Sequence, residues 1–402
     1  MKKNIVIAQS GGPSMVINAS LVGAVLGAKK LFKGRYGKIL GACHGLQGIL
    51  KGEYLDLGKV PEKKLDKILW TPSSALGSCR LKPTVKDCRK IFAEFRRLNV
   101  GFFFYIGGND SADAARIVAQ EAAKENYPLV AYHIPKTIDN DLRSCDHTPG
   151  YGSAARFVAM ALQGDDLDNR ALGGVKIDVI MGRDAGFLTA AASLARVRPD
   201  DGPHLIYLPE VVFTEEKFVR DVKAAMKKFG RCVVAVSEGI RGKDGVPLGA
   251  KLADGEKDSH GNVQMSGTGA LGDHLARLLK AKAGVKRVRA DTFGYLQRSF
   301  PGVQSRNDVE EAAMCGCVAV HAAMAAEAGD PRGYPLMGTI GLRRKPGKKY
   351  APDYVALPIQ DAAKYTRSVP KEFIAKNGHD VTDAFRAYAA PLVGDLPWCE
   401  VL

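Results

Sequence analysis

Several features that would place this chain in other classes of protein are missing from its sequence. No run of apolar residues approaches the roughly 18–20 residues that a membrane-spanning helix needs. The eight cysteines form no CxxC pair and have no histidines at metal-ligand spacing, which disfavours a zinc site and favours free thiols. The apolar stretch at the N-terminus is too short for a signal peptide and ends in a glycine turn. We therefore expect a cytoplasmic protein.

The chain also lacks the usual marks of a nucleic-acid-binding protein, although its net charge is +15 and its isoelectric point is about 9.4. The basic residues are spread along the chain, with no arginine-rich arm and no basic stripe interleaved with aromatic side chains. A site that collects phosphorylated small molecules explains the charge equally well, because a positive cleft steers anionic substrates. Charge alone leaves both interpretations open. The motifs below favour small-molecule substrates, with neither nucleic acid nor membrane as a partner.

Short apolar runs that are followed by turns and helix-prone stretches recur along the chain. This alternation predicts an α/β fold with mostly parallel sheets, in which ligands gather beyond the C-terminal ends of the strands. The length of 402 residues suits two domains. Alanine-rich helices are expected over Ser111–Lys124 and Ala185–Arg196. The expected strands are Ile5–Ala8, Phe102–Ile106, Val130–Ile134, Lys176–Met181 and Val233–Val236.

Two glycine-bearing turns are candidate phosphate cradles. Residues 9–14, QSGGPS, end the first strand, where paired glycines let backbone N–H groups approach an anion. Residues 106–111, IGGNDS, follow a strongly apolar strand, and Ser111 is placed to cap the next helix. Polar groups in this second turn suit Mg²⁺, which prefers oxygen ligands. For each turn the alternative is a plain strand-to-helix connection.

The most specific motif is residues 135–141, PKTIDND. One of its two aspartates can deprotonate an attacking hydroxyl, and the other can hold a metal ion. The lysine that precedes them can offset charge on phosphoryl oxygens. A solvated acidic turn is the alternative interpretation.

Three later motifs suit the recognition of a sugar phosphate. They are residues 181–184, MGRD, residues 238–239, EG, and residues 289–298, RADTFGYLQR. Arginines can bind phosphate in a bidentate manner, and a glutamate can accept hydrogen bonds from sugar hydroxyls. Taken singly, each motif is explained as well by a surface ion pair.

In their order along the chain, from about residue 5 to residue 307, these motifs resemble the phosphofructokinase family. The resemblance implies transfer of a phosphoryl group to the 1-hydroxyl of fructose 6-phosphate, which gives fructose 1,6-bisphosphate. It implies that Asp139 is the base and that Thr137 and Asp141 flank it. The donor phosphates would contact Gly12, Gly108 and Arg80. The sugar would contact Met181, Gly182, Arg183 and Glu238, and its 6-phosphate would contact Arg289, Tyr295 and Arg298.

Two side chains depart from the pattern of ATP-using members and concern the phosphoryl donor. Asp110 replaces a glycine and would put volume and negative charge where a nucleotide α-phosphate must pass. Lys136 replaces another glycine and would put positive charge where the leaving group accumulates negative charge. With Asp139 they form the expected catalytic set, which resembles the pyrophosphate-dependent branch of the family. An ATP-dependent phosphofructokinase, or the same chemistry on sedoheptulose 7-phosphate, is the alternative.

The resemblance also implies Mg²⁺ as the cofactor and a homodimer or homotetramer. Asn109 stands where many members have an aspartate associated with Mg²⁺, so it is the candidate ligand, with a weaker oxygen donor. ATP-using bacterial members send an arginine across from a neighbouring subunit, but Gly174 occupies that position here. Lys176 is a candidate substitute.

The expected architecture is two Rossmann-like three-layer domains with a C-terminal extension. The donor domain would comprise residues 1–150 with about 297–335, and the sugar-phosphate domain residues 151–296, with a surface excursion over 241–264. Residues 336–402 would pack on these domains as the extension. A dinucleotide enzyme is disfavoured because no G-x-G-x-x-G follows a strand with an acid about twenty residues later. A non-catalytic phosphate sensor would not need the base, the lysine and the sugar-side arginines together.

Overall fold

The strand β4, Val100–Gly107, is buried at every position. Phe102 and Phe104 belong to one apolar cluster, whereas Phe103 and Tyr105 belong to another. Successive side chains of a strand point to opposite faces, so helices must cover this sheet on both sides. The predicted α/β fold with mostly parallel sheets is confirmed.

The computed structural model describes residues 2–31, 34, 36–252, 267–347, 349–363 and 366–401. The chain divides into two units. Unit 1 consists of residues 1–150 and 306–366, and unit 2 of residues 151–305 and 367–402. Each unit has its own sheet, and each is described by itself.

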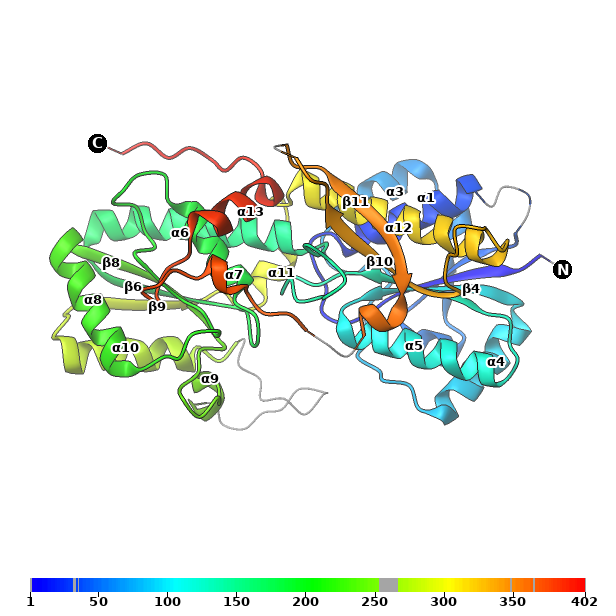
Figure 1. Ribbon diagram of the computed structural model, residues 1–402, viewed down its shortest axis with the longest axis horizontal. Helices are drawn as coiled ribbons and strands as arrows, with labels where there is room; N and C mark the ends of the chain where they lie inside the picture. Colours follow the sequence, from blue (N-terminus) through cyan, green and yellow to red (C-terminus); the bar gives the residue numbers. More distant parts are fainter. Residues whose placement is uncertain are drawn as a thin grey trace. The chain divides into compact units, whose positions relative to one another are not determined.

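The sheet of unit 1 has the order β11-β10-β5-β4-β1-β2-β3. Its pairs are parallel except for β10 with β11 and β2 with β3. In Figure 1, α1 and α12 lie on one side of this sheet and α4 and α5 on the other. The other strands are β1 (Asn4–Gln9), β2 (Ile39–Ala42), β3 (Tyr54–Asp56), β5 (Val130–Pro135), β10 (Met337–Arg344) and β11 (Pro352–Pro358). The helices are α1 (Ile17–Leu31), α2 (Leu46–Lys51), α3 (Glu62–Leu69), α4 (Val85–Arg97), α5 (Asn109–Lys124) and α12 (Arg306–Glu327), with the 3₁₀ turns η1 (Leu57–Lys59) and η3 (Ile359–Asp361).

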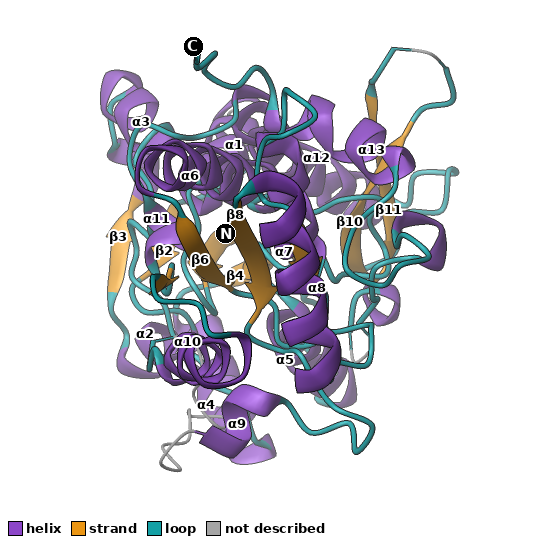
Figure 2. Ribbon diagram, turned by 90° about the vertical axis from the view of Figure 1, so that its left-hand side faces the viewer, coloured by secondary structure: helices purple, strands orange, loops and turns teal. Residues whose placement is uncertain are grey.

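Unit 2 contains a fully parallel sheet in the order β7-β8-β6-β9. Figure 2 shows β6 and β8 between α6 on one side and α10 on the other. The strands are β6 (Gly174–Ile180), β7 (Leu205–Tyr207), β8 (Arg231–Ser237) and β9 (Val288–Thr292). The helices are α6 (Tyr151–Leu172), α7 (Phe187–Ala191), α8 (Glu215–Phe229), α9 (Leu248–Leu252), α10 (Ala270–Ala283), α11 (Leu296–Ser299) and α13 (Asp383–Val393), with the 3₁₀ turns η2 (Ala192–Ala195) and η4 (Lys371–Phe373).

The helix α12 is long and apolar enough to cross a membrane by length and composition alone. It nevertheless packs along α1 and against β5, β10 and β11 inside unit 1. Half of its most apolar window is buried there. These contacts account for its composition as that of a core helix.

All five expected strands are present, but one expected helix is not continuous. Residues 185–196 form the short helix α7, which then tightens into the 3₁₀ turn η2. The segment stops at Arg196, whose guanidinium group is held by the carbonyl oxygen of Pro203 and the carboxylate of Asp380. Of the expected surface excursion over 241–264, residues 253–264 lie outside the described residues.

The C-terminal part of the chain is divided differently from the expected extension. The strand β10 pairs with β5, and Ile340 and Leu342 join the core of unit 1. A parallel strand left at the edge of a sheet exposes unpaired backbone groups, so β10 and β11 complete the sheet. Residues 297–305, expected in the donor domain, belong to unit 2, where the Gln297 side chain accepts a hydrogen bond from the Met181 amide.

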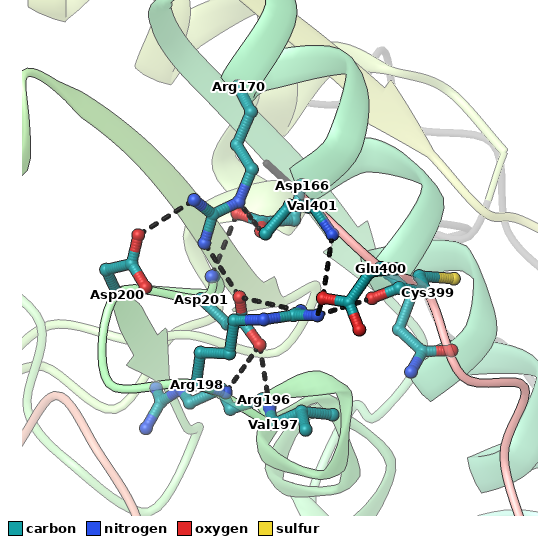
Figure 3. A network of polar contacts seen from close by, with 12 residues as sticks. Asp166, Arg170, Arg196, Val197, Arg198, Asp200, Asp201, Cys399, Glu400 and Val401 are labelled. Carbon is teal, nitrogen blue, oxygen red and sulfur yellow. Dashed lines mark hydrogen bonds and ion pairs between the residues drawn. The ribbon is translucent and has the colours of Figure 1, made fainter.

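The last residues of the chain are tied to unit 2 by a network of charged groups (Figure 3). Arg198 donates to the Cys399 carbonyl and to the Glu400 carboxylate. Asp201 accepts hydrogen bonds from the amides of residues 197 and 198 and from Arg170. Arg170 also reaches Asp166 on its own helix. The tail is therefore anchored on the same network that holds α6.

Candidate active site

The first glycine turn, residues 9–14, and the motif of residues 135–141 meet at one side chain. Lys136 follows β5 and is only 4% exposed, and its Nζ donates to the Gly12 carbonyl oxygen at 2.5 Å. Gly11 has a φ of +73°, and a Cβ at this position would lie 3.3 Å from the same Nζ. Any other residue would strain the turn and crowd the ammonium group. The structure therefore brings Lys136 to the first glycine turn.

The second turn lies beside the first. The Ser10 hydroxyl donates to the Ile106 carbonyl at 2.9 Å and lies in hydrogen-bonding contact with the Ser111 hydroxyl at 2.6 Å. The helix α5 begins at Asn109, with Gly108 as its N-cap. The expectation that Ser111 caps the helix is wrong, because the helix starts two residues earlier and Ser111 instead bonds to Ser10. The positive end of a sixteen-residue helix is thus placed beside the two turns.

Asn109 and Asp141 are brought together, as a metal site would require. The Asn109 Nδ2 donates to Asp141 Oδ2 at 3.1 Å. The Asn109 Oδ1 is buried and has no hydrogen-bond partner among the described residues. A buried oxygen without a partner is costly unless something binds it. An oxygen ligand next to a carboxylate fits a hard cation such as Mg²⁺.

The loop that carries the two aspartates is held by its own backbone. The Thr137 amide donates to the Pro149 carbonyl at 3.1 Å, and the Asp139 amide donates to the Thr137 hydroxyl at 3.1 Å. Asn140 is fully buried with a φ of +59°, and its side-chain oxygen accepts from the Thr148 amide at 3.0 Å. Asn tolerates this left-handed conformation better than most residues. Asp139 and Asp141 are therefore presented on a loop of fixed shape.

Two further residues expected near the donor are exposed. Asp110 lies in the first turn of α5, where a negative charge suits the positive end of the helix. Arg80 follows Cys79, whose carbonyl accepts from the Gly11 amide at 3.0 Å. This bond brings the segment that ends in Arg80 to the first turn.

Several residues of unit 2 that are expected to hold the sugar lie at the ends of β6 and β8. Gly182 has a φ of +146°, and a Cβ there would lie 2.6 Å from the Ala185 carbonyl oxygen. The Ser237 hydroxyl donates to the Gly182 carbonyl at 2.6 Å, and the Gly182 amide donates to the Glu238 carboxylate at 3.4 Å. Met181 and Glu238 are each 7% exposed. The backbone of Arg183 is fixed by Arg241, which donates to its carbonyl oxygen.

Within the motif of residues 289–298, Tyr295 and Arg298 contact each other, but Arg289 does not lie with them. The Arg298 guanidinium lies 4.4 Å from the centroid of the Tyr295 ring, in a cation–π contact, and Tyr295 is 45% exposed. Arg289, in contrast, is an exposed residue of β9 that pairs with Lys176 on β6. Lys176 precedes Met181 by five residues, which is roughly 16 Å along a strand. Within one chain, Arg289 therefore lies apart from the others.

Lys176 is occupied by acids rather than placed to bind a phosphate. Its ammonium group contacts the carboxylates of Asp291, Asp165 at 3.2 Å and Asp178 at 3.9 Å. These three carboxylates lie close enough together for a metal ion, but the ammonium group already bridges them. Burial, together with the Asp165 carboxylate, raises the pKa of Asp178 well above its usual range.

Two buried histidines of unit 1 were not singled out from the sequence. His133 on β5 contacts the Gly107 carbonyl through Nε2 at 2.8 Å and the Thr339 hydroxyl through Nδ1 at 2.8 Å. Burial lowers the pKa of His133 to about 4, so it is a neutral support for the turn after β4. His147 lies between two acids. In the sequence, His133 is marked only by its place within an apolar strand, and His147 only by the aspartate before it.

Known proteins share both the sequence and the fold of this chain. The family profile described as Phosphofructokinase matches residues 4–323. The pyrophosphate–fructose 6-phosphate 1-phosphotransferase of Rhodospirillum rubrum is 52% identical over 394 residues, which cover 98% of this chain and 95% of that protein. The protein of the same name from Xanthomonas campestris is 36% identical and covers 98% of this chain and 92% of its own length.

A solved structure gives the same result. The crystal structure of the pyrophosphate-dependent phosphofructokinase from Nitrosospira multiformis matches with a TM-score of 0.86 and 32% identity, covering all of this chain and 94% of that one. The resemblance inferred from the ordered motifs is confirmed. This chain belongs to the phosphofructokinase family.

Proposed function

We propose that this protein transfers a phosphoryl group from pyrophosphate to the 1-hydroxyl of fructose 6-phosphate, giving fructose 1,6-bisphosphate and phosphate. The reaction is a reversible step of glycolysis and gluconeogenesis. The observation that carries the choice of donor is the Lys136 ammonium group, which is buried against the first glycine turn. A fixed positive charge at this point stabilises the negative charge that develops as the bond to the leaving group breaks.

The residues of unit 1 are assigned to the donor and to proton transfer. Gly12, Gly108 and Arg80 bind pyrophosphate, and Asp110 excludes the longer chain of a nucleotide. Asp139 takes the proton of the 1-hydroxyl as the oxygen attacks phosphorus. Thr137 and Asp141 flank Asp139 on the loop that the Pro149 and Thr148 bonds hold in shape.

A bound Mg²⁺ would neutralise charge on the pyrophosphate oxygens. The residues present fit this ion, because the Asn109 amide contacts the Asp141 carboxylate through Nδ2 and its buried Oδ1 has no hydrogen-bond partner in the described part of the chain. Asn109 would hold the ion together with the carboxylates of Asp139 and Asp141.

The residues of unit 2 are assigned to the sugar phosphate. Met181, Gly182, Arg183 and Glu238 hold the sugar, and Tyr295 and Arg298 hold its 6-phosphate. Since Arg289 lies apart from these residues within one chain, its role at a 6-phosphate requires the site of a second copy. We therefore propose that the protein is a homo-oligomer, either a dimer or a tetramer. Its proposed location is the cytoplasm.

One assay tests the reaction. Purified protein is incubated with fructose 6-phosphate, Mg²⁺ and either pyrophosphate or ATP, and fructose 1,6-bisphosphate is measured. Turnover with pyrophosphate and little with ATP is expected. If ATP served at least as well as pyrophosphate, the donor assignment would be wrong. Sedoheptulose 7-phosphate, tested as the second acceptor, should give a lower kcat/KM than fructose 6-phosphate.

A further inference from the structure

His147 lies in a buried position between two carboxylates. Its Nδ1 is 2.8 Å from Asp146 Oδ2, and its Nε2 is 2.7 Å from Glu311 Oε2. The side chains of His147 and Glu311 are only 2% and 5% exposed. Asp146 belongs to the loop after β5, whereas Glu311 belongs to α12. The imidazole ring therefore joins two elements that are far apart in the sequence.

The geometry sets the protonation state of the ring. A neutral imidazole has one N–H group, so its second nitrogen would present a lone pair to a carboxylate oxygen. With both nitrogens donating, the ring is an imidazolium with an acid on each side. Burial alone would lower the pKa of His147, but the hydrogen bonds and charges of Asp146 and Glu311 outweigh it and raise the pKa above its usual value.

Other charged and titratable groups complete the cluster. From the β10–β11 hairpin, Arg344 contacts Asp146 at 3.3 Å, and Tyr350 donates to Glu311 and lies 3.0 Å from His147 Nε2. From α12, Asp308 accepts from the Gly150 amide at 2.8 Å. Asp146 also lines an open cleft of about 560 Å³, which gives the cluster access to bulk solvent.

The residues that follow His147 hold the loop of Asp139. The Thr148 amide donates to Asn140, and the Thr148 hydroxyl donates to the Thr137 carbonyl at 2.7 Å. The Thr137 amide donates in return to the Pro149 carbonyl. Three hydrogen bonds thus join residues 148–149 to residues 137–140, while His147 on one side and the Asp308–Gly150 bond on the other fix this segment to α12.

We propose that His147 is a positioning residue of the active site, which as an imidazolium clamps residues 148–150 to α12 and thereby sets the loop that carries Asp139. The inference rests on the proposed phosphoryl transfer. It assigns no contact with substrate to His147. The clamp acts only through the loop, and it loosens when the imidazolium loses its proton.

The first test replaces His147 by Gln, which can hydrogen-bond but cannot carry the charge. The value of kcat should fall by roughly 10- to 100-fold, as for a small displacement of a reacting group, with KM for both substrates nearly unchanged. His321→Gln, an exposed position on the same α12, serves as the matched control and should retain the kcat of the unmodified enzyme. A kcat within twofold of the unmodified enzyme for His147→Gln would overturn the proposal.

The second test uses pH and avoids a change at the histidine itself. In the unmodified enzyme, kcat should decline on the alkaline side as His147 loses its proton. Glu311→Gln removes one of the two charges that stabilise the imidazolium, so this decline should move to lower pH by roughly one unit. Glu310→Gln, at the exposed neighbour of Glu311, should leave the pH of this decline unchanged. An alkaline decline that does not move in Glu311→Gln would contradict the clamp.

Two measurements do not depend on turnover. Nitrogen NMR of histidine-labelled protein, assigned with His147→Gln, should show both ring nitrogens of His147 protonated at pH 7.5. Hydrogen exchange of the amides of Thr137, Thr148 and Gly150 should accelerate in His147→Gln but not in His321→Gln. A singly protonated ring or unchanged exchange would overturn the clamp. Absence of any transfer from pyrophosphate in the unmodified enzyme, with both measurements as expected, would instead remove only the proposed function.

Discussion

The Lys136 ammonium group donates to the carbonyl oxygen of Gly12 across 2.5 Å, although 124 residues separate the two in the sequence. This bond joins the turn after β1 to the turn after β5. Because β4 lies between these strands in the sheet, the turn that starts α5 falls between them. The three motifs expected to bind the phosphoryl donor therefore form one group of residues at the C-terminal ends of adjacent parallel strands, where α/β folds bind ligands.

Replacing Lys136 by Met should remove the positive charge while keeping most of the side-chain volume. We expect kcat with pyrophosphate to fall by roughly 100- to 1000-fold, the effect of losing one group that stabilises developing charge. KM for fructose 6-phosphate should stay close to its original value. Steady-state kinetics of Lys124→Met, an exposed lysine at the end of α5, provide the comparison and should match the unmodified enzyme.

The donor preference should respond to Asp110 and Lys136 together. The double variant Asp110→Gly/Lys136→Gly restores both glycines of the ATP-using pattern. We expect kcat/KM for pyrophosphate to drop and measurable turnover with ATP to appear, because the obstructing carboxylate and the charge for the shorter leaving group are both gone. Parallel assays with the two donors measure the ratio. If the ratio of kcat/KM for pyrophosphate to kcat/KM for ATP did not change, other residues would determine the donor specificity.

Asp139→Asn should abolish most of the activity without disturbing the loop. The amide cannot accept the proton of the attacking hydroxyl, so kcat should fall by roughly 10²- to 10⁴-fold. The Asp139 backbone amide still donates to the Thr137 hydroxyl, and fructose 6-phosphate binding measured by calorimetry should persist. Asp66→Asn, an exposed position on α3, is the control. Near-normal turnover in Asp139→Asn would exclude Asp139 as the base.

Acid should destabilise the protein partly through His133. The pKa of this buried imidazole is lowered to about 4, whereas the unfolded chain takes up the proton near pH 6.5. Below pH 6.5 the unfolded state therefore binds more protons, and the free energy of unfolding falls until about pH 4, by at most ~3 kcal/mol from this group. His133→Gln should flatten the dependence in denaturant titrations over this range. A curve for His133→Gln parallel to that of His321→Gln would contradict this account.

The network of Figure 3 should be important for the stability of unit 2. Asp166 is 5% exposed and accepts from Arg231, from Arg170 and from the Gly202 amide. Asp166→Asn leaves the buried Arg231 guanidinium without its carboxylate partner, and the free energy of unfolding should fall by roughly 3–5 kcal/mol. Asp168→Asn, two residues away and largely exposed, should change it by less than about 1 kcal/mol. Equal effects of the two substitutions would rule out this role for the network.

The strands and their turns could be predicted because their signals are local. Apolar runs such as Val100–Gly107 end at glycines, and the chemistry lies directly after them. The strand β10 gave a weaker signal, since Gly338 and Gly341 interrupt it, and glycine is disfavoured in strands. Its partner β11 follows a turn in a lysine-rich stretch, so the pair was expected to be an extension rather than part of a sheet.

The site could be predicted only as far as its motifs are local. The distance between Lys136 and Gly12, and the position of Arg289 away from Tyr295, depend on strand register, which the sequence does not state. His147 shows the same limit. Asp146 is its neighbour in the sequence, but Glu311 is separated from it by 164 residues, so the charge of the ring becomes evident only when α12 is in place.

Unit 1 is built from two segments, and the second, residues 306–366, is synthesised after residues 151–305 of unit 2. Until α12 and β10 have been synthesised, β5 is an open edge, α1 lacks the helix along which it packs, and His147 lacks Glu311. The intervening residues 151–305, most of unit 2, are complete by then. Unit 1, which carries Asp139, therefore closes only after residues 151–305 have been synthesised, and in a nascent chain stalled before β10 the loop of Asp139 still lacks part of the sheet beside it.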